Sequence, residues 1–579
     1  MIKKRICIII SVFIFALNLY SQENVPQYPP ENPEFISPND IKPGMEGVGY
    51  SVFKGTNIEP FRVRVLSVSK YSVKTRILVE FLDDHLKKSG IVQGMSGSPI
   101  YFDGKLAGAL AFGWLYNKNP TGEITPIEYM YELYNDSYYT NTNNNVSFSY
   151  NNLNLNTSHK TPLFVSGISQ SAIDEYSEKF ESIGFQILSA DNSLESFSST
   201  NDKFLFGDSM FMPFSDGDFS AGAIGTVTHT DNDKFLIFGH EAGDSLGRFV
   251  VPVSRSSIAY IFPSYKASFK NPSSPSSNYI GYTLYNSPYG VSGKYGELPD
   301  NVMIPIKLNI NYSNFPKKEY NFRILNNAYI FPNIINMNIY NFANELSFDG
   351  IFTINYEIET DYFKDVIKIS DKVFNLSGRS LANSINKFLS PIFTLLNNKT
   401  DNITIKSIKI SMNQKDLQYG SMADLLVMEN KISAGDTIHL KLGVVPYSKQ
   451  KEYIDIPLKI PNNLKSGTYT IYIGNEYGYE DVENQLFPNK YSEGSLDYIY
   501  KIMNSDYSYD TLKIWFYPSQ NEQQDENSSY PLLPYSRYSI TAVNMDSDAY
   551  SPPVIKNYEL NYDIIGLKKI DIKIEESRK

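Results

Sequence analysis

The sequence predicts a mainly β protein whose C-terminal half includes a β-sandwich. Short segments of alternating apolar and polar residues, separated by glycines, recur along the 579-residue chain. Tyr (45) and Phe (35) are abundant and Trp (2) is scarce, which suits strands better than helical bundles. Beyond residue 400, several alternating segments follow one another at short intervals with turn residues between them, a pattern typical of an antiparallel sandwich.

The first 21 residues are typical of a secretory signal. Lys3, Lys4 and Arg5 form a basic start, the apolar run 6–19 has the length of a signal core, and Ser21 is a suitable small residue before a cleavage point. The alternative is an uncleaved anchor, although the run is shorter than the ~20 residues that span a bilayer. We therefore expect an extracytoplasmic protein (periplasmic, secreted or on the cell surface) that contacts a membrane only if this segment is retained.

Cysteine content and charge exclude several kinds of site. The single cysteine, Cys7, lies inside the expected signal, so the mature chain would have no disulfide, thiolate metal ligand or cysteine nucleophile. The formal net charge of -11 and the lack of a basic stripe argue against nucleic-acid binding. No phosphate loop, dinucleotide fingerprint or zinc motif is present, and we expect no metal or cofactor.

Alternation predicts the elements of the N-terminal half. In 61–68 (FRVRVLSV), Phe61, Val63 and Val65 fall on one face and two arginines on the other. The segment 171–183 instead has the apolar spacing of a helix. Further strands are expected at 77–82, 104–113, 223–227, 234–238 and 302–310, and the polar stretch 137–160 is typical of a linker.

The C-terminal half contains one expected helix. Apolar residues from Leu381 to Leu396 are spaced for an amphipathic helix that could kink at Pro391. Strands are expected at 403–410, 437–444, 453–460 and 468–473, and 518–530 is a polar stretch without periodicity.

The segment GMSGSP (94–99) is the strongest candidate site. Its glycines allow positive φ angles and close approach of a substrate, and the amides of Gly94 and Ser96 could form an oxyanion hole for a nucleophilic Ser96. A tight structural loop is the alternative. Ser98 is the rival hydroxyl, but Pro99 holds it in an extended conformation. A hairpin follows at 101–113, as it does after the similar serine loop of chymotrypsin-like peptidases.

A nucleophilic serine needs a base, and the chain has five histidines. His159 lies in the polar linker, His439 in a strand of the far domain, His85 in a charged stretch, and His229 at a strand end before a turn. His240 comes directly after the expected strand 234–238 and Gly239, so it is the best placed to reach a cleft. The alternative is a structural histidine.

Two blocks of sequence resemble the SpoIVB serine peptidases, the family of a stage IV sporulation protein. SGIVQGMSGSPI (89–100) and DGKLAGAL (103–110) resemble the part that carries the family's serine, with looser similarity at 121–130. The opening PGMEGVGYSVFKGT (43–56) resembles the longer exported bacterial members of the family. FGHEAGD (238–244) resembles the segment with the catalytic histidine, and 287–296 resembles the end of the same barrel. The resemblance implies that Ser96 is the nucleophile and His240 the base.

The resemblance implies a chymotrypsin-like double β-barrel with its barrels in exchanged order. In the sporulation peptidase the histidine block comes first, whereas here Ser96 precedes His240 by 240 - 96 = 144 residues. A site built across two barrels tolerates this exchange, because a triad depends on geometry and not on chain order.

The expected organisation has seven segments. They are a signal peptide (1–21), an exposed leader (22–42), a Ser-bearing barrel (43–135), a linker with a crossover helix (136–203), a His-bearing barrel (204–312), a β/α segment (313–400) and a sandwich-like domain (401–579).

The sequence does not decide which residue is the third member of the triad. Resemblance places an acid shortly before the serine motif, which makes Asp83 the first choice and Asp84 the next, while Asp244 lies on the histidine's own loop. Each of them could equally be a surface carboxylate.

The expected function is a serine endopeptidase that acts on exported or envelope proteins through an acyl-enzyme, with self-processing or a regulatory cascade as a further implication of the resemblance. The alternative is an inactive, peptidase-like scaffold that binds a surface partner through its C-terminal β domains.

Overall fold

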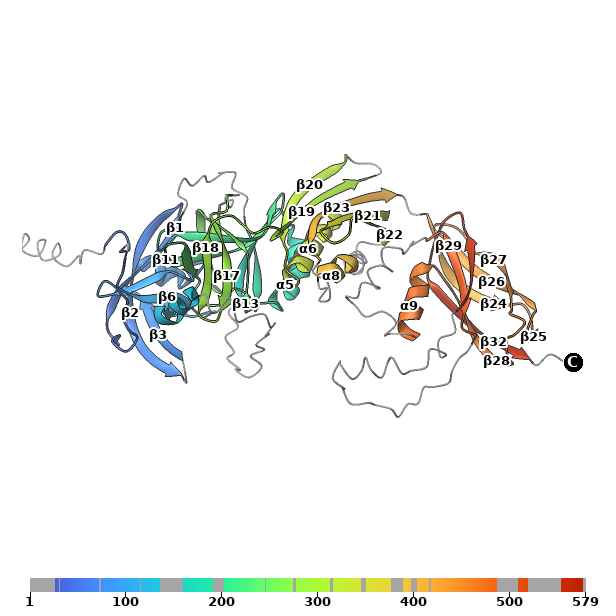
Figure 1. Cartoon of the computed structure of the whole chain (residues 1–579), viewed down its shortest axis with the longest axis horizontal. Coiled ribbons are helices and arrows are strands. Elements are labelled where there is room, and N and C mark those ends of the chain that lie inside the picture. Colours follow the sequence, from blue (N-terminus) through green and yellow to red (C-terminus); the bar gives the residue numbers. More distant parts are fainter. Residues whose placement is uncertain are drawn as a thin grey trace, which may run out of the picture. The chain divides into compact units, whose positions relative to one another are not determined.

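The protein is mainly β and forms two compact units in a computed structural model (Figure 1). Unit 1 comprises 1–307, 320–345 and 405–407, and unit 2 comprises 308–319, 346–404 and 408–579. The structure describes residues 26–575 except 31, 72–73, 115, 136–159, 191–202, 245, 274–277, 313–315, 345–349, 376–388, 397–402, 416–417, 487–508 and 519–552.

The first barrel of unit 1 is closed, with strand order β1-β2-β3-β7-β6-β5. Its strands are β1 (Glu46–Lys54), β2 (Asn57–Tyr71), β3 (Lys74–Phe81), β5 (Pro99–Phe102), β6 (Lys105–Phe112) and β7 (Thr121–Pro126). Phe61, Val63 and Val65 of β2 are at most 1% exposed, as their alternation predicts, because they fill the barrel interior. Residues 34–36 add to the edge of β6, where the Ile36 amide donates to the Leu106 carbonyl.

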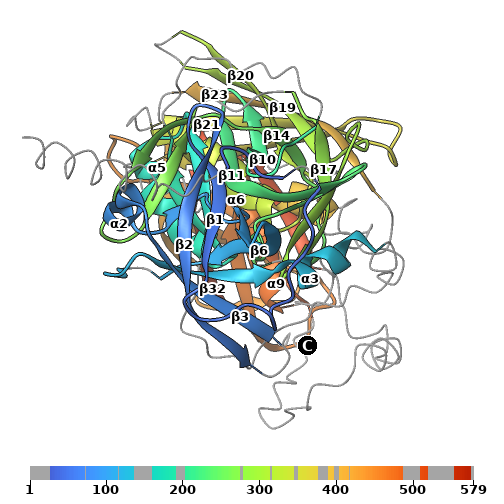
Figure 2. The ribbon, with the colours of Figure 1, turned by 90° about the vertical axis from the view of Figure 1, so that its left-hand side faces the viewer.

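The second barrel of unit 1 also closes. Its strands pair in the order β10-β14-β17-β18-β12-β11, and β11 pairs back with β10. They are β10 (Ser209–Gly217), β11 (Ser220–Asp231), β12 (Lys234–Ile237), β14 (Pro252–Arg255), β17 (Gly281–Ser287) and β18 (Gly290–Tyr295). Figure 2 shows β11 of this barrel behind β1 and β2 of the first. The chymotrypsin-like double barrel with the Ser-bearing barrel first is therefore confirmed.

Two helices of unit 1 pack on each other beside the second barrel. The predicted helix is α5 (Gln170–Glu181), with Ile173, Tyr176 and Phe180 buried. Its partner α6 (Ile330–Asn344) was not predicted. The side chains of Tyr176 and Tyr340 meet with ring centroids 5.7 Å apart.

Unit 2 contains the expected sandwich. One sheet has the order β27-β26-β24-β31 and the other β25-β32-β28-β29-β30. Their strands are β24 (Tyr419–Val427), β25 (Ile432–Ser433), β26 (Thr437–Pro446), β27 (Glu452–Lys459), β28 (Gly467–Gly474), β29 (Thr511–Phe516), β30 (Val554–Glu559), β31 (Asp563–Ile565) and β32 (Leu567–Glu575). Leu440, Leu442, Ile471 and Ile514 are fully buried in one core cluster between them. The unit also holds the hairpin of β21 (Gly350–Thr360) and β22 (Ile367–Asn375) and the helix α9 (Glu476–Leu486).

The other strands expected from alternation are also present. They appear as β3, β6, β11, β12, β19 (Met303–Asn311), β23 (Ile405–Lys415), β26, β27 and β28. Of the helix expected at 381–396, the structure describes α8 (Ser390–Leu396), with Pro391 in its first turn, while 381–388 lie outside the described residues, so the expected kink stays a prediction. The signal segment, the linker 136–159 and nearly all of 518–530 also lie outside the described residues. Within the part of the chain that is described, no helix has the length and apolar character to cross a bilayer.

Candidate active site

The Ser96 loop joins β4 (Val92–Gln93) to β5 and rests directly on β11 of the second barrel. Three hydrogen bonds attach it. The Thr226 amide donates to the Ser96 carbonyl at 2.8 Å, the Thr226 hydroxyl to the Gly94 carbonyl at 2.9 Å, and the Thr228 hydroxyl to the Gly97 carbonyl at 2.8 Å. Both barrels therefore determine the conformation of this loop.

The close approach of the loop to β11 requires a glycine at position 97. Gly97 has a φ of +98°, which L side chains rarely adopt. A Cβ at this position would lie 1.9 Å from the Thr226 carbonyl oxygen. The glycine predicted to let the backbone approach a substrate thus lets it approach the second barrel.

The Ser96 hydroxyl is loosely held and half-buried. It donates to the Ala111 carbonyl of β6 at 3.4 Å, a long distance for a hydroxyl donor. The backbone hydrogen bonds described for the loop are donated by the amides of Met95, Gly97 and Ser98, and none by that of Ser96. The hydroxyl and the amide of Ser96 can therefore form hydrogen bonds with a ligand without breaking a strong existing one.

Ser98, the rival hydroxyl, is fully buried. It donates to the Met95 carbonyl at 2.6 Å and lies 3.0 Å from the Ser51 hydroxyl of β1. Among the described contacts, those of the Ser98 hydroxyl stabilise the loop from its buried side.

His240 follows β12 after two residues with left-handed backbone, Phe238 (φ 68°) and Gly239 (φ 71°). Such a conformation is uncommon for a bulky residue and is found at functional sites. The Thr125 hydroxyl of the first barrel donates to the Gly239 carbonyl at 2.7 Å. The His240 ring lies between Phe112 and Phe238, with centroids 5.6 and 5.7 Å away.

The imidazole of His240 is fixed in one tautomer. Nδ1 lies 2.6 Å from the Glu241 carbonyl oxygen, which can only accept, so Nδ1 carries the proton and Nε2 keeps its lone pair. Burial lowers the pKa of His240 to about 4, so the ring is neutral at pH 7. A neutral ring with a free Nε2 lone pair is the form that a general base requires.

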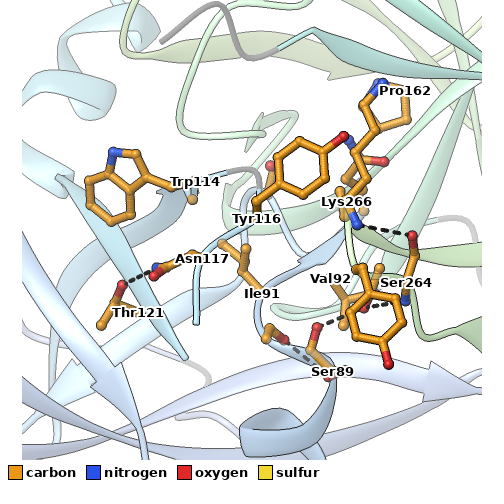
Figure 3. Close-up of a pocket in the computed structure, with 18 of the residues that line it drawn as sticks. Ser89, Ile91, Val92, Trp114, Tyr116, Asn117, Thr121, Pro162, Ser264 and Lys266 are labelled. Carbon is orange, nitrogen blue, oxygen red and sulfur yellow. Dashed lines mark hydrogen bonds between the residues drawn. The ribbon is translucent and has the colours of Figure 1, made fainter. Parts of the chain in front are cut away.

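Ser96 and His240 line the same pocket, although no hydrogen bond joins these two described side chains. Figure 3 shows Trp114 and Tyr116, from the segment after β6, and Ser264 and Lys266, from the segment before β16, around this pocket. The Tyr116 amide donates to the Lys266 carbonyl at 3.0 Å and ties the two segments together. The remaining lining residues are Ser89, Gly90, Ile91, Val92, Gln93, Gly94, Ala111, Gly113, Asn117, Asn119, Thr121, Lys160, Pro162, Tyr265, Ala267 and Ser268.

The three candidate acids have other neighbours. Asp83 precedes α2 (Asp84–Ser89) and pairs with Arg62 at 3.3 Å. Asp84 is exposed and lies 3.5 Å from Lys87. Asp244 is exposed beside Gly184. Among the described hydrogen bonds, none links these carboxylates to His240, and the acid of the triad stays a prediction.

The other described histidines lie away from the Ser96 pocket. His229 is buried, stacks on Phe206 at 5.1 Å and is hydrogen-bonded to Tyr134, which is the environment of a structural residue. His85 packs against Phe53, and His439 pairs with Asp455 in unit 2. His159 lies outside the described residues.

Sequence reasoning missed the polar residues beneath the loop: Ser51, Thr226 and Lys270. None of them belongs to a recognisable motif. The one available signal is that Lys270 lies within a strand, β16 (Ser268–Pro272), that is otherwise free of charge. Within the described residues no cluster of acidic, histidine or cysteine side chains could hold a metal ion.

Comparison with known proteins supports the interpretation of the first barrel. The family model for the SpoIVB peptidase S55 family matches residues 18–131, which include the Ser96 loop and end before the second barrel. No curated protein matches the chain, and no solved structure does. Residues 18–131, the part of the chain that carries Ser96, therefore belong to the SpoIVB serine peptidase family.

Proposed function

We propose that the protein is a serine endopeptidase that cleaves exported or envelope proteins, with Ser96 as nucleophile and His240 as base. The observation that carries this proposal is that two barrels, far apart in sequence, bring Ser96 and a neutral, single-tautomer His240 to the walls of one pocket.

The chemistry follows from these groups. Nε2 of His240 takes the Ser96 proton while Oγ bonds to the scissile carbonyl carbon, and the carbonyl oxygen becomes an oxyanion. The amide of Ser96, with that of Gly94, stabilises this charge. The intermediate then collapses, the C–N bond breaks, and the leaving amine receives the proton from His240. Water, deprotonated by His240, hydrolyses the acyl-serine and restores the enzyme.

The orienting role usually given to a triad acid is assigned here to a backbone carbonyl. The Glu241 carbonyl oxygen holds Nδ1–H at 2.6 Å, which fixes the ring as a carboxylate would. It brings no full negative charge, so it stabilises the imidazolium less. We therefore expect a slower enzyme than one with a carboxylate in this place.

The class of substrate and the location rest on the sequence. The basic and apolar start of the chain supports export, so exported or envelope proteins are the substrates within reach. The pocket wall offers Trp114, Tyr116 and Tyr265, the last of which is fully exposed. Aromatic side chains of this kind can pack against apolar side chains of a peptide.

A fluorophosphonate probe tests the proposal, because it reacts with an activated serine. The Ser96 Oγ–P bond forms as fluoride leaves and His240 takes the proton. We expect labelling of the full-length protein, loss of labelling in Ser96→Ala and His240→Ala, and slower but still detectable labelling in Ser98→Ala, which removes only the rival hydroxyl. Equal labelling of the wild type and Ser96→Ala would overturn the assignment. A wild type that is folded but does not label would favour the binding scaffold instead.

A further inference from the structure

A lysine lies buried directly beneath the Ser96 loop. Lys270 is 0% exposed, and its side chain packs against the Gly94 backbone, where an added Cβ would come within 3.1 Å of the lysine Cδ. Among the described residues no carboxylate pairs with its ammonium, whose neighbours are two hydroxyls and the Phe53 ring, 6.0 Å away. A buried charge without a counter-ion is costly and requires an explanation.

The ammonium starts a chain of hydroxyl groups. Nζ of Lys270 donates to the Ser51 hydroxyl at 2.8 Å. Ser98 donates to the Ser51 hydroxyl at 3.0 Å and to the Met95 carbonyl at 2.6 Å, and its single proton is shared between these two acceptors. A charged ammonium on the Ser51 oxygen makes that oxygen a poorer acceptor, which leaves the Ser98 proton to the Met95 carbonyl. The contacts therefore connect Lys270 through Ser51 and Ser98 to the Met95 carbonyl.

A second branch ends on the neighbouring peptide. Nζ of Lys270 lies 3.5 Å from the Thr226 hydroxyl, which donates to the Gly94 carbonyl at 2.9 Å. The carbonyl groups of Gly94 and Met95 therefore both face the side of the loop on which Lys270 lies.

The Met95 carbonyl and the Ser96 amide belong to one trans peptide, since the described chain has no cis bonds. In a trans peptide the C=O and N–H bonds point in opposite directions. Holding the Met95 oxygen inward therefore aims the Ser96 amide outward. A hydrogen bond that pulls on the carbonyl also makes the amide of the same peptide a stronger donor.

We propose that Lys270 is a positioning residue for the oxyanion hole, acting through Ser51 and Ser98 on the peptide that joins Met95 to Ser96. This inference rests on the proposed peptidase function and names a residue outside the segment that matches the family.

The charge of Lys270 should be visible in the pH dependence. Burial lowers the pKa of Lys270 to about 7, and the groups that face its ammonium, the hydroxyls of Ser51 and Thr226 and the ring of Phe53, do not titrate near that pH. As the pH rises through 7, the lysine loses its charge and polarises the chain less. The rate of reaction at Ser96 should fall in the same interval.

The test measures the rate of fluorophosphonate labelling of the full-length protein between pH 5.5 and 9. Five proteins are compared: wild type, Lys270→Met, Ser51→Ala, the double variant of these two, and the control Lys54→Met, which removes an exposed lysine of the same strand as Ser51. At pH 6, Lys270→Met and Ser51→Ala should label roughly 10- to 100-fold more slowly, the effect of a misaligned catalytic group. Both should lack the fall in rate near pH 7, and the double variant should be no slower than Lys270→Met alone.

A Lys270→Met protein that labels at the wild-type rate, or keeps the fall near pH 7, overturns the inference while labelling at Ser96 still supports the peptidase. If Lys270→Met does not fold by circular dichroism, Ser51→Ala decides alone, and a wild-type rate and profile for it overturns the inference. Absence of labelling at Ser96 in the wild type rejects the proposed function itself. A lysine that is only structural would change stability but leave the pH profile of the folded protein intact.

Discussion

At the scale of single residues, the site depends on two buried nitrogen bases that are both poorer bases than usual. His240 and Lys270 lose basicity for the same reason, since burial penalises their charged forms. The consequences differ, because a base must be neutral to accept a proton and a positioning cation must be charged to polarise its neighbours.

The neutral form of His240 should persist far into the acid range. Because its pKa is lowered to about 4, the ring gains a proton only as the pH falls toward that value. We expect the rate of fluorophosphonate labelling to be nearly constant from pH 6.5 to 5.5 and to halve near pH 4. A midpoint near 6.5, the value of an exposed histidine, would contradict this environment.

Replacement of Lys270 should stabilise the fold at low pH. The folded pKa of about 7 lies below that of an exposed lysine, so below pH 7 the folded state pays fully for a buried charge, and this cost disappears as the pH rises toward 10.5. Lys270→Met should therefore raise the free energy of unfolding by about 2–4 kcal/mol at pH 6. The gain should shrink at pH 9, as urea denaturation at the two pH values would reveal. An equal effect at both would contradict a titrating lysine.

At the scale of elements, the loop around Ser96 is shaped more by β11 than by its own sequence. Gly97→Ala should lower the free energy of unfolding by about 2–4 kcal/mol and abolish labelling, because the new Cβ would collide with the Thr226 carbonyl. Gly104→Ala is the matched control. Gly104 also has a positive φ, +75°, but open space around it, so its replacement should cost about 1 kcal/mol and leave labelling intact.

The strands were predictable because alternation records which face is buried, as in Phe61, Val63 and Val65 of β2. The helix α6 was not predictable from local pattern, because it is rich in Ile and Asn, which are weak helix formers. It is stabilised by tertiary contacts instead. The side chain of Asn341 accepts from the Ser169 amide at 2.7 Å and donates to the Gly167 carbonyl at 3.1 Å.

At the scale of the molecule, the sequence placed Ser96 and His240 on different barrels, and the closed barrels and shared pocket support that placement. The sequence alone could not identify Lys270, Ser51 or the Glu241 carbonyl as parts of the site. These groups act through contacts between residues up to 219 positions apart, and a backbone carbonyl leaves no mark in a sequence.

Each unit contains one of the two tryptophans, which makes their unfolding separable. Trp114 lines the pocket of unit 1, and Trp515 is fully buried in unit 2 against Tyr472, 5.5 Å away. Since each unit has its own core, we expect two distinct guanidinium unfolding curves from Trp114→Phe and Trp515→Phe. Superimposable curves from the two single-tryptophan proteins would show one cooperative unit instead.

The exchanged order of the barrels determines the order in which the parts of the site are synthesised. A growing chain carries Ser96 for 240 - 96 = 144 residues before His240 exists, and the loop lacks Thr226 for most of that time and Lys270 for all of it. Under the proposed function, Ser96 therefore has no base while these residues are being synthesised. It would become reactive only once the second barrel has closed on the first, so that the completion of folding acts as the activation step.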